Sequence, residues 1–402
     1  MRTNCHHQTW LSPSRLDCAS HSPITSSITT RGHGRRRGRW TPPPNAPRAT
    51  SPRLAVYSWN IDYALPFAPA RMRAALEALE NVICGRFQTS PETAVVIFFQ
   101  ECVKSDLETL AESKWVRGRF ALTELPSDAW NSWRTSGYGT TALLDRRLEG
   151  CGVFRVYYGA ESQMRRDALF VDLTFHSETR PRKENPFHRD VRTVRLCTTH
   201  LESLPDETNM PPLRARQMGM VADYLEKKAR SGSAGIVAGD FNASQDFDRS
   251  LHAEHGLRDA YLEMGGREDC DEAYTWGQQA KTAERERFGC ARMDKVLFFN
   301  PGVDAAGSAC AGAGAGAGDA NKDEVIRLLR FERFGAGVEL PATTEGGEEQ
   351  RAQLVDMGFE KPWITDHLGV MAEFDIVFPT MEEEKEAYRL PVTGRELGED
   401  DD

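Results

Sequence analysis

The chain has no run of apolar residues long enough to cross a membrane as a helix. Its densest apolar stretch, residues 94–99, has only the length of a buried strand, so a membrane-spanning helix is excluded. The nine cysteines are odd in number and form no C-x-x-C pair. We therefore expect neither a disulfide scaffold nor a cysteine zinc site, and a reducing compartment fits best.

The motifs of several common enzyme classes are also missing. The sequence has no serine or cysteine nucleophile motif, no P-loop and no H-E-x-x-H zinc motif. The Gly/Ala tract at residues 305–319 is repetitive and does not form the strand–G-x-G-x-x-G–helix unit that binds dinucleotides. Strand and helix patterns do not alternate regularly, which makes a parallel Rossmann sheet the weaker interpretation.

Basic residues are scarce over most of the chain. Residues 1–53 contain nine arginines, no lysine and one acid, whereas the remaining 349 residues contain 41 basic and 59 acidic side chains. An acidic body argues against non-specific binding to a polyanion over the whole surface, although a local basic groove stays open. It also fits a site in which carboxylates hold a divalent metal.

The composition predicts one folded domain between two tails. Of the 402 residues, 40% are hydrophobic and 27% are charged, which is typical of a globular chain with a sizeable core. Residues 1–53 are rich in Ser, Thr, Pro and Arg and predict a disordered tail; a transit peptide and a basic nuclear-import or nucleic-acid patch are the alternatives. The domain is expected over residues 54–378, with residues 305–319 as a flexible loop insertion and residues 379–402 as an acidic tail.

Apolar patterns in this domain predict many strands and few helices. Helices are expected over residues 69–87 and 211–230, each with an apolar face. Strands are expected over residues 54–61, 93–101, 139–145, 151–158, 168–175, 191–202, 234–242, 293–299 and 368–378. Many strands with few intervening helices predict a two-layer β core flanked by helices.

Polar residues stand at the ends of these apolar strands. The segments are W-N-I-D at 59–62, Q-E at 100–101, T-H-L-E-S at 199–203, G-D-F-N at 239–242, R-M-D at 292–294 and T-D-H at 365–367. A turn explains one such ending, but six together predict that the strand ends converge on a pocket. Carboxylate and amide oxygens favour Mg²⁺ or Mn²⁺, and imidazoles can bind phosphate oxygens. The set predicts metal-assisted hydrolysis of a phosphate ester.

This ordered series, with T-W at 275–276, resembles the endonuclease/exonuclease/phosphatase superfamily. The W-N-I-D and H-L-E-S forms most resemble its tyrosyl-DNA phosphodiesterase 2 branch, over roughly residues 54–378. The resemblance implies a four-layer α/β sandwich, in which two facing, mostly antiparallel sheets are flanked by helices and the active site lies across one end. It also implies Mg²⁺ (or Mn²⁺) as the cofactor.

The resemblance assigns a role to each motif residue. The implied metal ligands are Glu101, Asn60 and Asp366; a rim carboxylate or a turn is the plain alternative for each. The implied catalytic residues are Asp240 and Asn242, which orient the water and contact the phosphate, His367 with its partner Asp294, and His200 as a second phosphate contact. Glu202 would support His200, and Asp62 matches the acid of the W-N-I-D motif, for which the resemblance implies no definite role.

Substrate contacts are expected from Trp276, Arg214 and Ser203, although a core tryptophan and a solvated arginine are the competing explanations. The sequence departs from the resembled branch at three points. Tyr63 replaces a glycine, Cys102 replaces an aliphatic residue, and residues 243–244 (AS) replace a Leu-Arg pair. The missing arginine would have supplied a charge-assisted phosphate contact.

The resulting expectation is a Mg²⁺-dependent phosphodiesterase that cleaves 5′-tyrosyl-DNA bonds in DNA repair. Its partners would be DNA 5′ ends with a tyrosyl adduct and no membrane, and it would act as a monomer, in the nucleus rather than in the mitochondrion or cytoplasm. Alternatives are another member of the superfamily, such as an abasic-site endonuclease, RNA exonuclease or lipid-head-group phosphatase, and a non-catalytic nucleic-acid adaptor.

Overall fold

The computed structural model describes residues 53–378, except for the segments 87–92, 128–132, 135–136, 178–190, 204–211, 227–232, 302–323 and 344–345. The expected tails at 1–53 and 379–402 therefore lie outside the described residues, apart from Arg53, which begins the first strand. The expected loop insertion at 305–319 also lies outside them. No helix in the described part is both long and apolar enough to cross a membrane.

The first sheet contains six of the described strands and carries the W-N-I-D, Q-E and T-D-H motifs. Its order is β11-β12-β1-β2-β4-β3, and only β1 and β2 run parallel. The strands are β1 (Arg53–Asn60), β2 (Ala94–Val103), β3 (Phe120–Leu122), β4 (Tyr138–Asp145), β11 (Ile326–Phe334) and β12 (Gly369–Ile376).

The second sheet repeats this plan in the order β5-β6-β7-β8-β10-β9. Here β7 and β8 are the parallel pair, and their other neighbours are antiparallel. The strands are β5 (Glu149–Tyr157), β6 (Asp167–His176), β7 (Val191–His200), β8 (Ala234–Asp240), β9 (Arg258–Asp259) and β10 (Asp294–Phe299).

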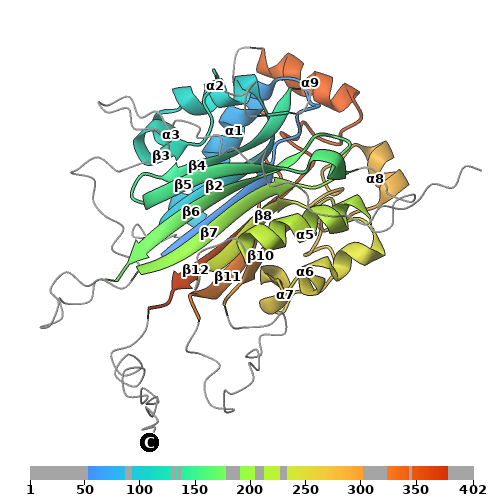
Figure 1. The fold of residues 1–402 in the computed structure, drawn as a ribbon. Helices are drawn as coiled ribbons and strands as arrows, with labels where there is room; N and C mark the ends of the chain where they lie inside the picture. Colours follow the sequence, from blue (N-terminus) through green and yellow to red (C-terminus); the bar gives the residue numbers. More distant parts are fainter. Residues whose placement is uncertain are drawn as a thin grey trace, which may run out of the picture.

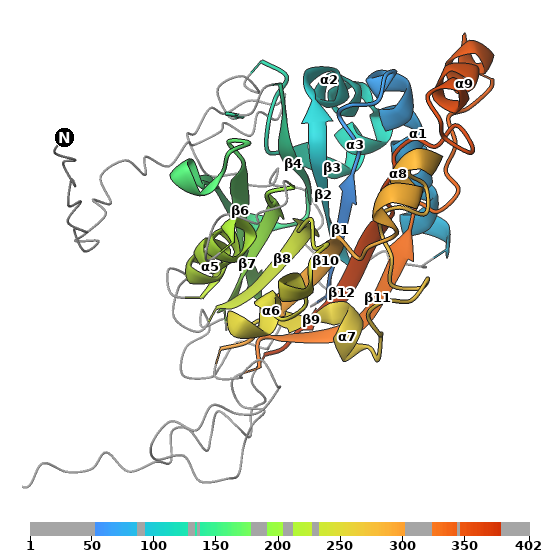
Figure 2. The ribbon, with the colours of Figure 1, turned by 90° about the vertical axis from the view of Figure 1, so that its right-hand side faces the viewer.

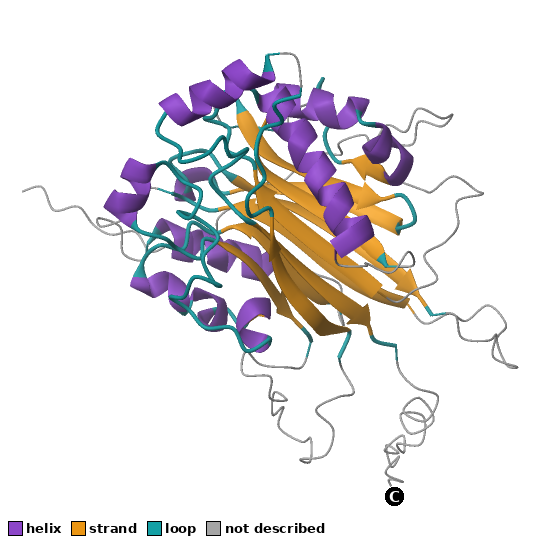
Figure 3. Ribbon diagram, turned by 180° about the vertical axis from the view of Figure 1, so that it is seen from behind, coloured by secondary structure: helices purple, strands orange, loops and turns teal. Residues whose placement is uncertain are grey.

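Helices cover both outer faces, so that four layers result (Figure 1 and, from the side, Figure 2). The first sheet is covered by α1 (Ala68–Asn81), which continues as a π-helical turn over Val82–Arg86, and by α2 (Lys104–Glu112), α3 (Lys114–Arg119) and α9 (Gly347–Asp356). The second sheet is covered by α5 (Leu213–Leu225) and α6 (Leu251–Glu254). The short helices α7 (Ala260–Glu263) and α8 (Thr282–Phe288) lie in the connections, and Figure 3 shows the sheets enclosed by helices from behind.

The strands are buried on both faces, which explains why their apolar runs are continuous. In β1, Leu54 and Val56 face the second sheet, whereas Tyr57 and Trp59 pack under the helices of the first. Successive side chains of a strand point to opposite faces, so a strand buried on both faces needs apolar residues at nearly every position. The four-layer sandwich predicted from the sequence is therefore confirmed.

The predicted elements agree with the structure within a few residues, but the edge of the first sheet was missed. The strand β11 has the sequence IRLLRFERF, in which charged residues interrupt the apolar pattern. It pairs only with β12 at the sheet edge, where most of its side chains are half-exposed. Charged residues protect such edges from pairing with other chains, and they also hide the strand from a search for apolar alternation.

Candidate active site

The polar strand ends converge at one edge of the sandwich. The two parallel pairs, β1–β2 and β7–β8, bring Asn60, Glu101, His200 and Asp240 to this edge. Antiparallel β10 contributes its first residue, Asp294, which pairs directly opposite Asp240. The segment before β12 contributes His367.

Three residues at this edge have left-handed backbone conformations. Asp62, Glu101 and Asn242 have φ angles of 56°, 60° and 48°. Such a conformation costs a non-glycine residue about 1–2 kcal/mol. At Glu101 it coincides with a break in the β2–β4 register between Phe99 and Cys102. A bulge of this kind redirects a side chain, and here it turns the Glu101 carboxylate towards His200, whose Nε2 lies 3.7 Å from Oε1.

Asp240 lies at the centre of the site. Its Oδ2 accepts a hydrogen bond from Asn60 Nδ2 at 2.9 Å and lies 3.2 Å from His200 Nε2, and its Oδ1 accepts from the Asn242 amide at 2.8 Å. Burial alone would raise the pKa of this carboxyl, but the two histidines, His200 and His367, hold it well below its usual range. A carboxylate with so low a pKa is a weak base, so it is suited to orienting a water molecule by accepting its hydrogen bond.

His367 and Asp294 form the closest pair of the site. His367 Nδ1 lies 2.8 Å from Asp294 Oδ2, and its Nε2 lies 3.8 Å both from Asp240 Oδ2 and from Asp366 Oδ1. Burial disfavours the imidazolium, but Asp294, Asp366 and Asp240 raise the pKa of His367 well above its usual value. With Nδ1 donating to Asp294, the cationic ring directs its Nε2–H towards the centre, where it can bind a phosphate oxygen.

His200 differs in charge from His367. Burial, together with the nearby Arg166 guanidinium, lowers the pKa of His200, so that the ring is neutral at pH 7. Its contact with Asp240 assigns the proton to Nε2. The site thus contains one neutral and one positively charged imidazole on either side of the same aspartate.

The expected substrate-binding residues are mostly engaged with other protein groups. Trp276 donates its indole N–H to Asp366 Oδ2 at 2.7 Å, and Ser203 is exposed with its hydroxyl 3.2 Å from Met164 Sδ. Arg214 is buried and forms a bidentate pair with Asp248 at 2.9 and 2.8 Å. A phosphate could reach this guanidinium only by displacing Asp248. The substrate contacts of these three residues stay a prediction.

Glu202 is held in place by several hydrogen bonds, and its expected support of His200 stays a prediction. It is fully buried, its Oε2 accepts from Ser162 Oγ at 2.8 Å and its Oε1 from the Met164 amide at 3.1 Å. Its backbone N–H donates to Gln217 of α5 at 2.9 Å. These bonds fix the segment that follows His200.

The model of the Endonuclease/Exonuclease/phosphatase family matches residues 57–367, which is more than half of the chain and spans every motif described above. The chain belongs to the endonuclease/exonuclease/phosphatase family. This family consists of metal-dependent hydrolases, among them nucleases and phosphatases. No curated protein matches the sequence.

Several solved structures are similar to this family member. A humanized TDP2 of D. rerio is 19% identical, with 81% of this chain and 99% of that chain covered and a TM-score of 0.49. A truncated Caenorhabditis elegans TDP2 is 20% identical, with coverages of 80% and 98% and a TM-score of 0.48. The human Nocturnin catalytic domain is 15% identical, with coverages of 81% and 96% and a TM-score of 0.45.

Three carboxylates beside Asn60 fit the divalent metal that this family uses. Burial, and then the charges of Asp366 and Glu101, raise the pKa of Asp62 to about 8. Such mutual repulsion between oxygen donors is what a divalent cation relieves, and hard cations prefer this ligand chemistry. A second group, Asp240, Asp294 and His367, places its ligand atoms within 4.8 Å of one another, but a metal there would have to break the 2.8 Å His367–Asp294 bond. The carboxylates have the donor chemistry that a hard cation prefers, whereas Asp240, Asp294 and His367 are the group of described residues whose ligand atoms meet this distance.

Metal binding is expected to release protons. In the metal-free protein the Asp62 carboxyl, with a pKa of about 8, is largely protonated at pH 7 and must ionise beside a bound cation. The affinity for Mg²⁺ should therefore rise as the pH increases towards about 8. Titration calorimetry in buffers of different ionisation enthalpy measures the release. An enthalpy that does not change with the buffer would contradict this interpretation, and Asp62→Asn is the control in which the release should disappear.

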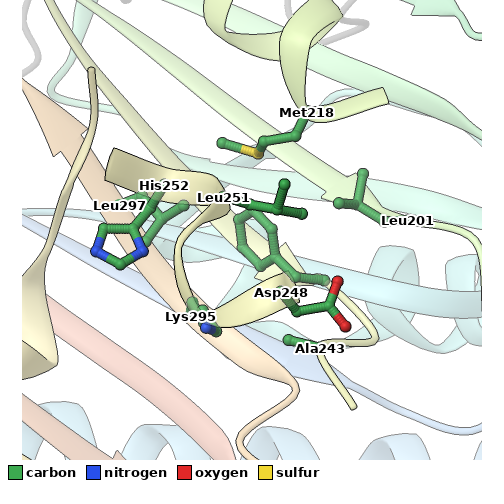
Figure 4. A pocket seen from close by; sticks show the side chains of 9 residues that line it. Leu201, Met218, Ala243, Asp248, Leu251, His252, Lys295 and Leu297 are labelled. Carbon is green, nitrogen blue, oxygen red and sulfur yellow. The ribbon is translucent and has the colours of Figure 1, made fainter. Parts of the chain in front are cut away.

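Lys295 is turned away from the site, towards a small pocket on the other face of the sheet. Lys295 follows Asp294 in β10, and Figure 4 shows it in a pocket with Met218, Leu251 and His252, under α5 and α6. Because neighbouring residues of a strand face opposite sides, Lys295 lies on the face opposite to that of Asp294. Tyr63 does lie near the site: its amide donates to Glu101 Oε2 at 2.9 Å, and its ring stacks on Tyr138 with centroids 4.1 Å apart.

The sequence reasoning missed Arg71, which is fully buried and whose guanidinium bonds the segments that carry Asp62 and Asp366. One signal could have revealed it. Arg71 precedes Met72 by one position and Ala75 by four, so it lies on the apolar face of α1, where an arginine needs several hydrogen-bond acceptors.

Proposed function

We propose that this protein is a Mg²⁺-dependent phosphodiesterase that hydrolyses 5′-tyrosyl-DNA bonds. The W-N-I-D and H-L-E-S motifs resemble the tyrosyl-DNA branch, and the structure brings the residues of these motifs to one edge. When bound, the metal would be held by Glu101 and its neighbouring carboxylates and would supply charge stabilisation at the phosphate.

The observation that carries the proposal is the scarcity of proton donors for a leaving group among the described residues of the site. Lys295 is turned to the other face of the sheet. The exposed Tyr63 is a weak acid, since partial burial and then Tyr138 and Glu101 raise its pKa further above 10. The Nε2 atom of positively charged His367 lies 3.8 Å from both Asp240 and Asp366, and we assign its proton to the non-bridging oxygens of the phosphate. A site with these groups favours a leaving group that departs as an anion, and phenolate, with a pKa of about 10, is far better than an alkoxide.

The chemistry of the remaining residues agrees with this substrate. Asp240 and Asn242 orient the water, His200 donates from Nε2, and His367 balances the charge that develops on the phosphate. The arginine cluster at residues 35–39, which precedes the described part, supports two further proposals, a nuclear address and DNA as the partner. We also propose that the enzyme acts as a monomer.

The decisive experiment compares a 5′-tyrosyl oligonucleotide with its unmodified twin in the presence of Mg²⁺. We expect the tyrosyl bond to be cleaved at least about a hundredfold faster, because each 1.4 kcal/mol of leaving-group advantage corresponds to about tenfold in rate. His367→Ala is the matched control for a contaminating nuclease, since both activities should fall in this variant. Comparable cleavage of both oligonucleotides would favour a general nuclease instead.

Abasic DNA, RNA and inositol phosphates complete the panel. A preference for any of them over the tyrosyl substrate would assign the protein to another branch of the family. The sequence gives a reason to test these substrates. Ala243 and Ser244 stand where the resembled branch has a Leu-Arg pair, so the arginine contact to the phosphate is missing.

A further inference from the structure

Arg71 occupies an unusual position for a charged residue. It lies in the first turn of α1, its side chain is fully buried, and it is surrounded by the apolar core under the first sheet. A buried guanidinium ordinarily faces a carboxylate, as Arg155 and Arg214 do elsewhere in this chain. Among the described residues, the hydrogen-bond partners of Arg71 are main-chain carbonyl oxygens instead.

These carbonyls come from two segments that are about 300 residues apart in the sequence. Arg71 Nη2 donates to Asp62 O at 2.8 Å and to Leu65 O at 2.9 Å, and Nε donates to Pro66 O at 2.8 Å. Nη1 is shared between Ile61 O and, at 2.8 Å, Ile364 O. One planar group therefore joins the segment that follows β1 to the segment that precedes β12.

Both segments carry the candidate metal ligands. The first contains Asp62, two residues after Asn60, and the second leads through Thr365 to Asp366. Thr365 adds a second link, since its Oγ1 donates to Asn60 O at 2.9 Å. Two side chains, Arg71 and Thr365, therefore join the Asp62 and Asp366 segments in the absence of a metal.

We propose that Arg71 is a positioning residue of the metal site, and that its guanidinium fixes the Asp62 and Asp366 segments relative to one another before a divalent cation binds. This inference rests on the metal-dependent part of the proposed function and not on the tyrosyl substrate. The role of Arg71 depends on the shape of its side chain. The planar, fork-shaped guanidinium can donate hydrogen bonds to five carbonyls at once, which no other side chain can do.

The charge of Arg71 and its hydrogen bonds should change the metal affinity in opposite directions, which makes the proposal testable. Arg71 is a cation behind a cation site, so removal of its charge alone would tighten metal binding. Loss of its hydrogen bonds would let the two segments separate and would weaken binding. Lysine keeps the charge but has only three donors from one point, whereas methionine removes both.

The experiment measures the dissociation constant of Mg²⁺ and of Mn²⁺ by calorimetry, well below the melting temperature of each variant. We expect Arg71→Lys to weaken metal binding by about ten- to a hundredfold, as is usual when a group that orients metal ligands is removed. Arg71→Met should also weaken it, but less, because the repulsion is gone. Unchanged affinity in Arg71→Lys, or tighter binding in Arg71→Met, would overturn the proposal.

Arg195→Met is the matched control. Arg195 is also mostly buried and binds a main-chain carbonyl, Tyr224 O at 2.8 Å, together with Asp172, but it lies on the outer side of β7. Its loss should lower the melting temperature while metal affinity stays unchanged. A merely structural role of Arg71 would give this same pattern.

A measurement on the unaltered protein covers the case in which neither Arg71 variant folds. Amide hydrogen exchange at Asp62, Ala64 and His367, whose N–H groups bond within the two segments, should be slow before any metal is added. Rapid exchange that becomes slow only on addition of Mg²⁺ would show that the metal orders these segments, and the proposal would be wrong. If no metal binds at all, the proposed function itself fails, which distinguishes the two outcomes.

Discussion

Replacement of Asp294 by asparagine is expected to lower kcat by about a thousandfold or more while KM changes little. In the wild type the Asp294 carboxylate, 2.8 Å from Nδ1, fixes the tautomer of His367 and stabilises its positive charge. Asparagine can present its amide N–H to Nδ1, which must then accept the bond, so that the ring loses its Nδ1 proton and its positive charge. Because the charge on His367 matters most when negative charge develops on the phosphate, the loss should appear in kcat.

The pH dependence of kcat should also change in Asp294→Asn, and the direction of the change can be predicted. The raised pKa keeps His367 positively charged through neutral pH, and the charge is lost only as the pH rises through that elevated value. In Asp294→Asn the strongest stabilising neighbour is gone, so the pKa of His367 falls and the alkaline limb of the kcat profile should move to lower pH. An unshifted limb would mean that another group sets it.

Asp259→Asn is the control for the loss of a buried carboxylate. Asp259 is buried like Asp294, lies opposite Leu297 of β10 and pairs with Arg292 at 2.8 Å rather than with a histidine. This variant should lose stability but keep the position of the alkaline limb. A similar shift in both variants would assign the effect to stability rather than to His367.

The convergence of the site could be predicted because strand ends are local features. Asp240 and Asp294 are each attached to an apolar run, and pairing of the two runs places them opposite one another. Adjacent parallel strands bring their ends to the same edge for the same reason. Residue type and order along the chain were therefore sufficient to find these groups.

Other parts of the site depend on information that no single segment contains. The bulge at Glu101 arises from a register break against β4, and the sequence of β2 alone gives no sign of it. The role of Arg71 depends on the Ile364 carbonyl, which is distant in the sequence. The protonation difference between His200 and His367 arises from burial and neighbouring charges that exist only in the folded chain.

Glu101→Gln should remove metal-dependent activity by about a thousandfold or more without unfolding the protein. A metal bound at the phosphate contributes several kcal/mol to transition-state stabilisation, and this substitution removes the principal charged ligand. The fold should survive because the amide oxygen of glutamine can still accept the hydrogen bond from the Tyr63 amide. Glutamine also adopts the same left-handed conformation, with φ near 60°, at a similar cost.

The thermal melting of the two proteins distinguishes a ligand from a structural residue. Without metal, the variant should melt at the same temperature as the wild type or higher, because one of the carboxylates that repel Asp62 has lost its charge. With Mg²⁺, the wild type should gain stability in proportion to metal binding, and the variant should gain almost none. Glu101→Asp, which keeps the charge on a shorter side chain, should recover part of the Mg²⁺ shift. A full Mg²⁺ shift in Glu101→Gln would show that Glu101 does not hold the metal, whereas a lower metal-free melting temperature would assign its charge to the stability of the strand end.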